Sequence, residues 1–137
     1  MKKALLFGLL TGILLLAVGM GLNYLLGALF PQLMAEYENV AIFRPWDDPK
    51  MSLFFIYPFL VALLLAFAWT KHKNAFQGST LKKGLIFGLT YFAIATIPGM
   101  LVSYSSFQVS ALMIGGWTLS GLLDGIIAGL IYAKWLK

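Results

Sequence analysis

The sequence predicts an all-α, polytopic membrane protein in which four transmembrane helices form one bundle. The chain of 137 residues is 61% hydrophobic and only 11% charged, whereas an ordinary soluble domain carries roughly 25% charged residues. Four apolar runs each reach the length of about 20 residues that spans a hydrocarbon core about 30 Å thick. The runs are continuous, unlike the alternating segments of a transmembrane β-barrel. Because lipid offers no partner for a free backbone N–H or C=O, each run is expected to be helical.

The whole chain, residues 1–137, is expected to be one domain. Its predicted helices are Ala4–Phe30, Met51–Trp69, Gly84–Tyr104 and Ser110–Ala133, joined by a long outer loop at 31–50, a cytoplasmic loop at 70–83 and a tight turn near 105–108. A signal peptide is the alternative for the first run, because Lys2 and Lys3 precede Leu-rich sequence. The run is longer than an h-region of about 7–15 residues, however, and no convincing cleavage site follows it.

The distribution of basic residues predicts the orientation. Arg44 and Lys50 lie in the loop 31–50, and the other basic residues lie at the opposite ends of the runs: Lys2, Lys3, Lys71, Lys73, Lys82, Lys83, Lys134 and Lys137. Because lysine and arginine accumulate on the cytoplasmic side, both termini are expected there, in the inner (plasma) membrane. Lysines at the ends of apolar runs indicate lipid headgroups, and no nucleic acid, as the partner. Four aromatic residues are expected to form interfacial belts: Trp69, Tyr104, Tyr132 and Trp135.

An internal repeat relates the two halves of the sequence. A shift of 80 positions superposes the third helix on the first, with identical residues at Lys2-Lys3, Phe7-Gly8-Leu9, Gly19-Met20 and Tyr24. Coincidence within the small residue alphabet of membrane helices is the alternative explanation. A true repeat would consist of two parallel helical hairpins related by an axis along the membrane normal. The halves then differ in the outer loop and at Asp124, whose counterpart in the second helix is Val61.

Glycines spaced four residues apart predict where the helices pack. Small residues allow close backbone approach, which drives helix association in lipid. The glycines that share a helix face are Gly8, Gly12, Gly84, Gly88, Gly121, Gly125 and Gly129. Most belong to the cytoplasmic half, where the helices are expected to converge. Pro58 and Pro98 interrupt the second and third helices and predict bends there. These bends serve either as ordinary shape control or as part of a gate.

Asp124 is the one acid within a predicted span. It lies about 10 residues from the end of the fourth helix, which places it about 15 Å deep at about 1.5 Å per residue. A central Asp costs about 2.5–3.5 kcal/mol to insert, so a partner, water or protonation is expected to offset that cost. The candidate neighbours are neutral: Ser120, Tyr57, Tyr91, Thr96 and Thr11. Two interpretations stay open, a proton- or cation-binding site on a transport path and a structural acid that joins helices or subunits.

The outer loop is the most chemically varied segment. Its candidate contact residues are Glu36, Glu38, Arg44, Trp46, Asp47 and Asp48. Asp47-Asp48 suits a helix N-cap leading into the second helix. The alternative is a lid or a cation-collecting mouth over the bundle. The carboxylates lack the spacing and the glycine of an EF-hand, so no metal site is expected.

Composition narrows the function. The absence of cysteine excludes disulfides, iron–sulfur clusters and thiol chemistry, and a single histidine, His72, excludes a bis-histidine haem within one chain. We expect no cofactor and, with one isolated membrane acid, no enzyme. The first functional prediction is an accessory or scaffold subunit that binds a membrane protein or forms a homo-oligomer through its glycine faces and outer loop. The alternative is a small proton- or cation-coupled transporter or channel component that acts as an oligomer through Asp124.

Three segments carry a family resemblance: the Lys2-Lys3 helix start, the FRPWDDP stretch at 43–49 and the IPGM and SYSSF stretches between 97 and 107. Together they resemble a family of small, uncharacterised four-helix bacterial inner-membrane proteins. The resemblance implies the fold and the location and no activity. The chain departs from small multidrug transporters, whose membrane acid is a Glu in the first helix. It also departs from vitamin K epoxide reductases, which need cysteines.

Overall fold

The computed structural model describes residues 1–136, which form helices and their connections and, within that range, no strand. In chain order the elements are α1 (Lys2–Leu29), α2 (Pro31–Tyr37), the 3-10 helix η1 (Pro49–Met51), α3 (Ser52–His72), the 3-10 helix η2 (Lys73–Ala75), α4 (Thr80–Tyr91), the π-helical segment η3 (Phe92–Thr96), α5 (Ile97–Ser106) and α6 (Ala111–Trp135). Lys137, one of the basic residues used to predict the orientation, lies outside the described residues.

Four continuous helical stretches are long and apolar enough to cross a membrane: Lys2–Leu29, Pro49–Ala75, Thr80–Ser106 and Ala111–Trp135. The predicted all-α architecture with four spans is therefore confirmed, and the chain has the architecture of a multi-pass membrane protein. The third span begins four residues earlier than predicted. Its N-cap, Ser79, accepts a hydrogen bond from the backbone N–H of Lys82. This cap satisfies a free backbone N–H of the first turn, so the helix begins before the lysines and includes them.

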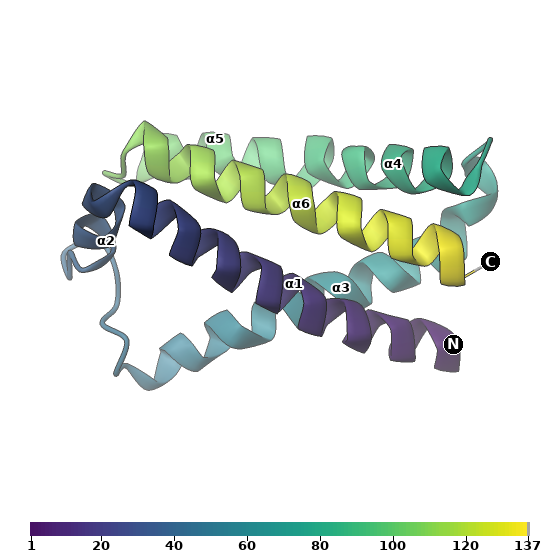
Figure 1. Cartoon of the computed structure of the whole chain (residues 1–137), viewed down its shortest axis with the longest axis horizontal. Helices are drawn as coiled ribbons and strands as arrows, with labels where there is room; N and C mark the ends of the chain where they lie inside the picture. The colour runs from purple at the N-terminus through teal and green to yellow at the C-terminus, as the bar shows by residue number, and fades with distance from the viewer. Residues whose placement is uncertain (137) are drawn as a thin grey trace.

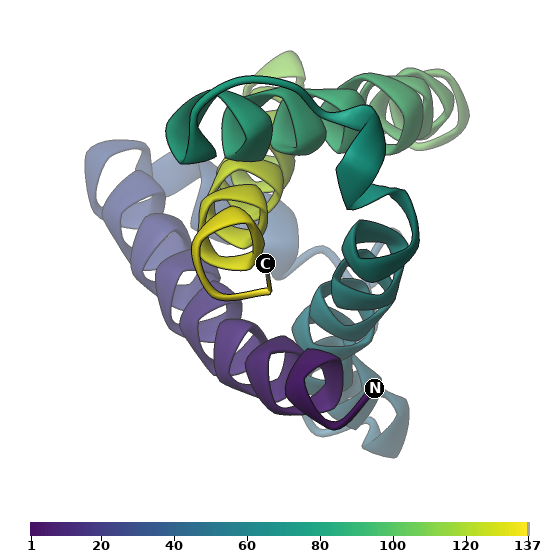
Figure 2. The same ribbon diagram turned by 90° about the vertical axis from the view of Figure 1, so that its right-hand side faces the viewer.

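The four spans form two hairpins that pack on each other. Both termini lie at one end of the bundle, together with the connection between α3 and α4, while α2 and the connection between α5 and α6 lie at the other end (Figure 1). Helix α1 packs mainly on α3 and α4 packs mainly on α6, and α6 also contacts α1 and α3. Seen from the end that holds the termini, α6 lies between α4 and α1 (Figure 2). We call the half with the termini the near half and the other the far half.

Glycines bring the helices of each hairpin together. A Cβ placed on Gly84 would lie 2.8 Å from the carbonyl oxygen of Gly129, and one placed on Gly88 would overlap the carbonyl of Gly125. In the first hairpin, a Cβ on Gly8 would lie 3.2 Å from Cα of Leu63. The four remaining predicted glycines also face neighbouring elements: Gly12, Gly121, Gly125 and Gly129. All seven glycines therefore serve contacts within the chain, as the i, i+4 spacing predicts.

Aromatic residues fill the core of the near half. Trp69 and Tyr132 are 2% and 0% exposed, so the prediction that they belong to an interfacial belt is wrong. Their polar groups are satisfied inside the bundle, because the Tyr132 hydroxyl donates to the carbonyl of Ala62 (2.7 Å) and the Trp69 indole donates to that of Leu136 (3.0 Å). A buried Tyr or Trp needs such a partner, and a backbone carbonyl serves as well as a headgroup.

The far half is more loosely packed. Helix α5 has no buried residue, and the first two turns of α3 are exposed. Both figures show α5 and the start of α3 on opposite sides of this half. Pro98 lies at the start of α5, directly after η3, where its missing N–H and its ring disturb the helix at the carbonyl of Ile94. The π-helical segment absorbs this disturbance and was not predicted from the sequence.

Candidate functional site

A pocket of about 620 Å³ lies in the far half, between the spans. Its size falls within the roughly 300–1,000 Å³ of small-molecule sites. Helices α1, α3 and α6, the α4–η3–α5 span and the outer loop all contribute to its wall. The five residues predicted as a site all line it: Asp124, Ser120, Tyr57, Tyr91 and Thr96. The structure therefore brings together side chains from three spans that are far apart in the sequence.

Asp124 is held in the wall by glycine contacts on either side. One turn earlier in α6, a Cβ placed on Gly121 would lie 2.6 Å from the hydroxyl oxygen of Thr96. At the next residue, a Cβ on Gly125 would lie 3.0 Å from the ring of Tyr91 and 2.6 Å from the carbonyl oxygen of Gly88. Helix α6 is thus packed tightly against the α4–η3 segment around Asp124. The side chain itself is 9% exposed and lines the pocket.

The carboxyl of Asp124 has no hydrogen bond or ion pair with another residue of the described range 1–136, where the one ion pair joins Arg44 and Asp48. The phenol of Tyr91 lies within electrostatic range of it, and Tyr57 and Thr96 lie beside that phenol. None of the cationic side chains described in the structure forms an ion pair with it. An acid buried in this way keeps an uncompensated cost.

Thr11 was expected as a neighbour of Asp124, but it is not among the residues that line the pocket. Its side chain is 1% exposed and lies beside Tyr132 in the near half. The hydroxyl oxygen of Thr11 is buried without a hydrogen-bond partner among residues 1–136. Residue spacing predicts a suitable depth for Thr11 in α1, and in the structure this residue packs beside Tyr132 of α6.

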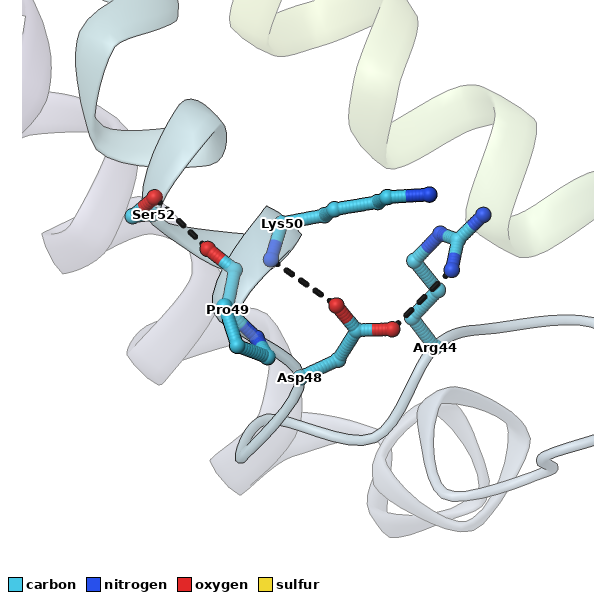
Figure 3. A network of polar contacts seen from close by, with 5 residues as sticks. All are labelled: Arg44, Asp48, Pro49, Lys50 and Ser52. Atoms are coloured by element: carbon cyan, nitrogen blue, oxygen red, sulfur yellow. Dashed lines mark hydrogen bonds and ion pairs between the residues drawn. The ribbon is translucent and has the colours of Figure 1, made fainter.

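The outer loop forms the mouth of the pocket, where Arg44 and Trp46 line it. The predicted N-cap is confirmed at Asp48: its Oδ1 accepts from the backbone N–H of Lys50 (2.8 Å) and its Oδ2 accepts from the Arg44 guanidinium (2.9 Å), as Figure 3 shows. The Ser52 hydroxyl donates to the carbonyl of Pro49 (2.7 Å) and continues the turn. The bond from Lys50, followed by that from Arg44, lowers the pKa of Asp48 below its usual value.

Helix α2 fastens the outer loop to α6. The carboxylate of Glu36 accepts from the backbone N–H and from the hydroxyl of Ser110 (2.7 Å for the hydroxyl), which is the N-cap of α6. The Trp117 indole donates to the hydroxyl of Tyr37 (2.7 Å), and burial raises the pKa of Tyr37, which keeps this phenol neutral. The other acids predicted as loop contacts, Glu38 and Asp47, are exposed.

Several pocket residues were not predicted as part of a site. They include Asn23 of α1, Tyr37 of α2, Phe54 of α3 and Trp117 of α6. The sequence does hold a signal for α2, because Pro31 occupies the first turn of that helix, where proline is favoured. Asn23 is a polar residue within an apolar run, which is a second signal. Aromatic residues such as Phe54 and Trp117 gave none, because their type is equally suited to facing lipid.

Within residues 1–136, no group of three or more His, Cys, Asp or Glu side chains is arranged to hold a metal ion. Neither a protein-family model nor a curated protein nor a solved structure matches the chain.

Proposed function

We propose that the protein is a small membrane transporter or channel component that binds a proton or another cation at Asp124 from the far half of the bundle. One observation carries this proposal: Asp124, a residue that is 9% exposed, lines a pocket of about 620 Å³, and its carboxyl has no protein partner within residues 1–136. Intramembrane acids are costly, and they mark ion and proton pathways more often than simple packing. Ser120, Thr96 and Tyr91 supply neutral oxygens around it.

We place the chain in the inner membrane with both termini in the cytoplasm. The support is the excess of lysines at the near end and the acidic loop at the far end. The pocket would then open to the outer side and reach about the middle of the bilayer. The same placement fits the resemblance to small four-helix bacterial inner-membrane proteins.

We further propose that the two hairpins are a parallel duplication. A shift of 80 positions superposes the third helix on the first and pairs Gly8 with Gly88. For the second and fourth helices the shift is 63 positions, which pairs Val61 with Asp124 and Leu63 with Ile126. A Cβ on Gly8 would contact Cα of Leu63, and a Cβ on Gly88 would contact Cα of Ile126. Equivalent residues thus make equivalent contacts in the two halves. Duplication followed by divergence would leave the acid in one half alone.

The accessory or scaffold role is the second candidate. This role was predicted from the glycine faces and the outer loop as surfaces for a partner. That support is weakened, because all seven predicted glycines make contacts inside the chain and α2 is bound to α6. One observation still favours it: α5 presents exposed apolar residues, among them Leu101 at 70% and Val102 at 62%. We propose this face for a second copy or a membrane-protein partner, which a transporter of four helices would also need to enclose a path. Neither role involves catalysis, since Asp124 is the only acid in the spans.

A flux measurement tests the first proposal. Purified protein in liposomes with a trapped pH-sensitive dye is given an inward proton gradient, with charge balanced by potassium and valinomycin. The wild type is expected to dissipate the gradient faster than empty liposomes, and Asp124→Asn is expected to match the empty liposomes. Glu38→Gln is the control, because it removes an exposed carboxylate outside the pocket. The comparison is repeated with a cation-sensitive dye and an inward cation gradient, and equal rates for wild type and Asp124→Asn in both assays would overturn the proposal and leave the accessory role.

A further inference from the structure

We propose that the pocket binds an organic monocation with a lipophilic body, an alkyl- or arylammonium ion whose charged group meets Asp124. The inference rests on the proposed function only in assigning a cation to Asp124. It adds the chemical class of that cation. Its support comes from the pocket's volume, charge, walls and position relative to the lipid.

The volume is far larger than a proton or a bare metal ion requires. At about 620 Å³ the pocket matches the space that a drug-sized molecule occupies. A small inorganic cation is also poorly served by the side chains present. Calcium takes about 6–8 oxygen ligands, and no cluster of three or more acidic or metal-binding side chains exists within residues 1–136. A molecule with one charge and a larger body uses the space better.

The charges that line the pocket leave one negative charge unmatched. Arg44 lies at the mouth, but its guanidinium is paired with Asp48 at 2.9 Å. Asp124 lies at the inner end without a partner among the described residues. The remaining polar side chains of the wall are phenols, hydroxyls, an amide and two indoles, which carry no charge. A single cation therefore neutralises the site, and removing both charges from water together lowers the cost of burying either one.

The walls favour an organic cation over a hydrated one. Aromatic rings line the pocket along its length: Tyr57 and Tyr91 lie on the side of Asp124, and Phe54 and Trp117 lie against residues of the outer loop. Aromatic faces attract ammonium ions through their quadrupole, and the attraction grows when the ion is desolvated. The same rings bury alkyl or aryl surface, which the hydrophobic effect favours. Both effects act on an alkyl- or arylammonium ion at once.

The pocket also borders the lipid. Helices α3 and α5 line it from opposite sides and make almost no contact with each other. Tyr57 of α3 is 55% exposed, and on α5 a Cβ placed on Gly99 would touch nothing within 4 Å. Apolar side chains of α3 and α5 beside this gap are exposed, so in a membrane the gap would meet lipid unless a second copy covers it. A lipophilic cation concentrates in the membrane interface and reaches this gap from there, whereas a hydrophilic ion does not.

Equilibrium binding tests the inference with a matched pair of probes. Benzyltrimethylammonium carries the charge, and neopentylbenzene has the same shape with carbon in place of the charged nitrogen. Each is titrated into the full-length protein in lipid nanodiscs, with Trp117 and Trp46 in the pocket as fluorescent reporters and empty nanodiscs as the partition control. We expect saturable binding of the cation, at least tenfold weaker binding to Asp124→Asn, and unchanged binding to Glu38→Gln. Neopentylbenzene is expected to bind wild type and Asp124→Asn alike.

The probe pair keeps the test independent of whether the variant folds, because both probes are compared on the wild type. Equal affinity for the two probes, or displacement of the cation by equimolar sodium, would overturn the inference. Binding is measured without a gradient, so it is separable from transport. Proton flux through Asp124 with no ammonium binding overturns this inference alone. Ammonium binding with no flux of protons or of the ammonium ion supports the inference and overturns the transport proposal.

Discussion

Gly129 of α6 lies against the carbonyl oxygen of Gly84 in α4 so closely that a Cβ on Gly129 would overlap that oxygen. The obstacle is backbone, which cannot rotate away as a flexible side chain can. One turn further along, Gly88 and Gly125 repeat the arrangement. The α4–α6 pair is therefore fixed in the near half by direct backbone contact, and the pocket in the far half depends on this fixed pair for its shape.

Gly129→Ala is expected to destabilise the fold by about 1–3 kcal/mol, the usual cost of overpacking. Gly115→Ala lies in the same helix where an added Cβ meets nothing within 4 Å. It is expected to be neutral or stabilising by up to about 1 kcal/mol through helix propensity. Denaturation of the purified variants in mixed micelles measures both. Equal stabilities would show that α4 and α6 are not in backbone contact.

Asp124→Leu is expected to stabilise the protein, by up to about 3 kcal/mol, because it removes an intramembrane acid that has no partner. The same change should abolish cation binding, which is the usual conflict between stability and a functional site. Ser120→Ala, one turn away in the same wall, is expected to leave stability nearly unchanged. Thermal unfolding in detergent provides the measurement. A clear loss of stability in Asp124→Leu would favour the interpretation of Asp124 as an acid that joins helices.

Glu36→Gln is expected to loosen α2 from α6. The carboxylate accepts two hydrogen bonds from Ser110, and an amide has a single acceptor oxygen. The cost is about 1 kcal/mol at this partly exposed position. Hydrogen exchange at the Ser110 amide should accelerate, while Glu38→Gln, an exposed acid on the same segment, should not change it. Unaltered exchange in Glu36→Gln would mean that α2 is held by apolar contacts alone.

Acid is expected to release the cap of η1. The pKa of Asp48 is lowered from its usual 3.8, so its ionised form is bound more strongly in the fold than in the unfolded chain. The resulting stabilisation is complete above pH 3.8 and disappears as the pH falls through the lowered pKa. The amide resonance of Lys50, which donates to Asp48, should therefore move below about pH 4. Asp47→Asn should keep this transition and Asp48→Asn should lose it. A transition that survives in Asp48→Asn would assign the titration to another group.

The spans, the cap at Asp48 and the use of glycines for packing follow from local sequence. Hydropathy along about 20 residues decides whether a helix lies in lipid, because each backbone group must be satisfied within its own helix. A cap depends on two or three neighbouring residues, and an i, i+4 glycine pair defines a face of one helix. Asp124 could be predicted as a candidate site for the same reason, because the free-energy cost of inserting an acid depends only on its residue type and its depth in the membrane.

Only the tertiary structure shows which residues the helix faces and the individual side chains contact. Trp69 and Tyr132 point inward, where backbone carbonyls of other segments accept their hydrogen bonds. These acceptors are far away in the sequence, so they cannot be predicted from neighbouring residues. Thr11 and Thr96 are equally polar, yet only Thr96 lines the pocket. The pocket exists because α3 and α5 diverge in the far half while backbone contacts hold α4 to α6 in the near half. Such a cavity depends on the rotation and tilt of four helices together, and rotation and tilt are set by packing between segments far apart in the chain.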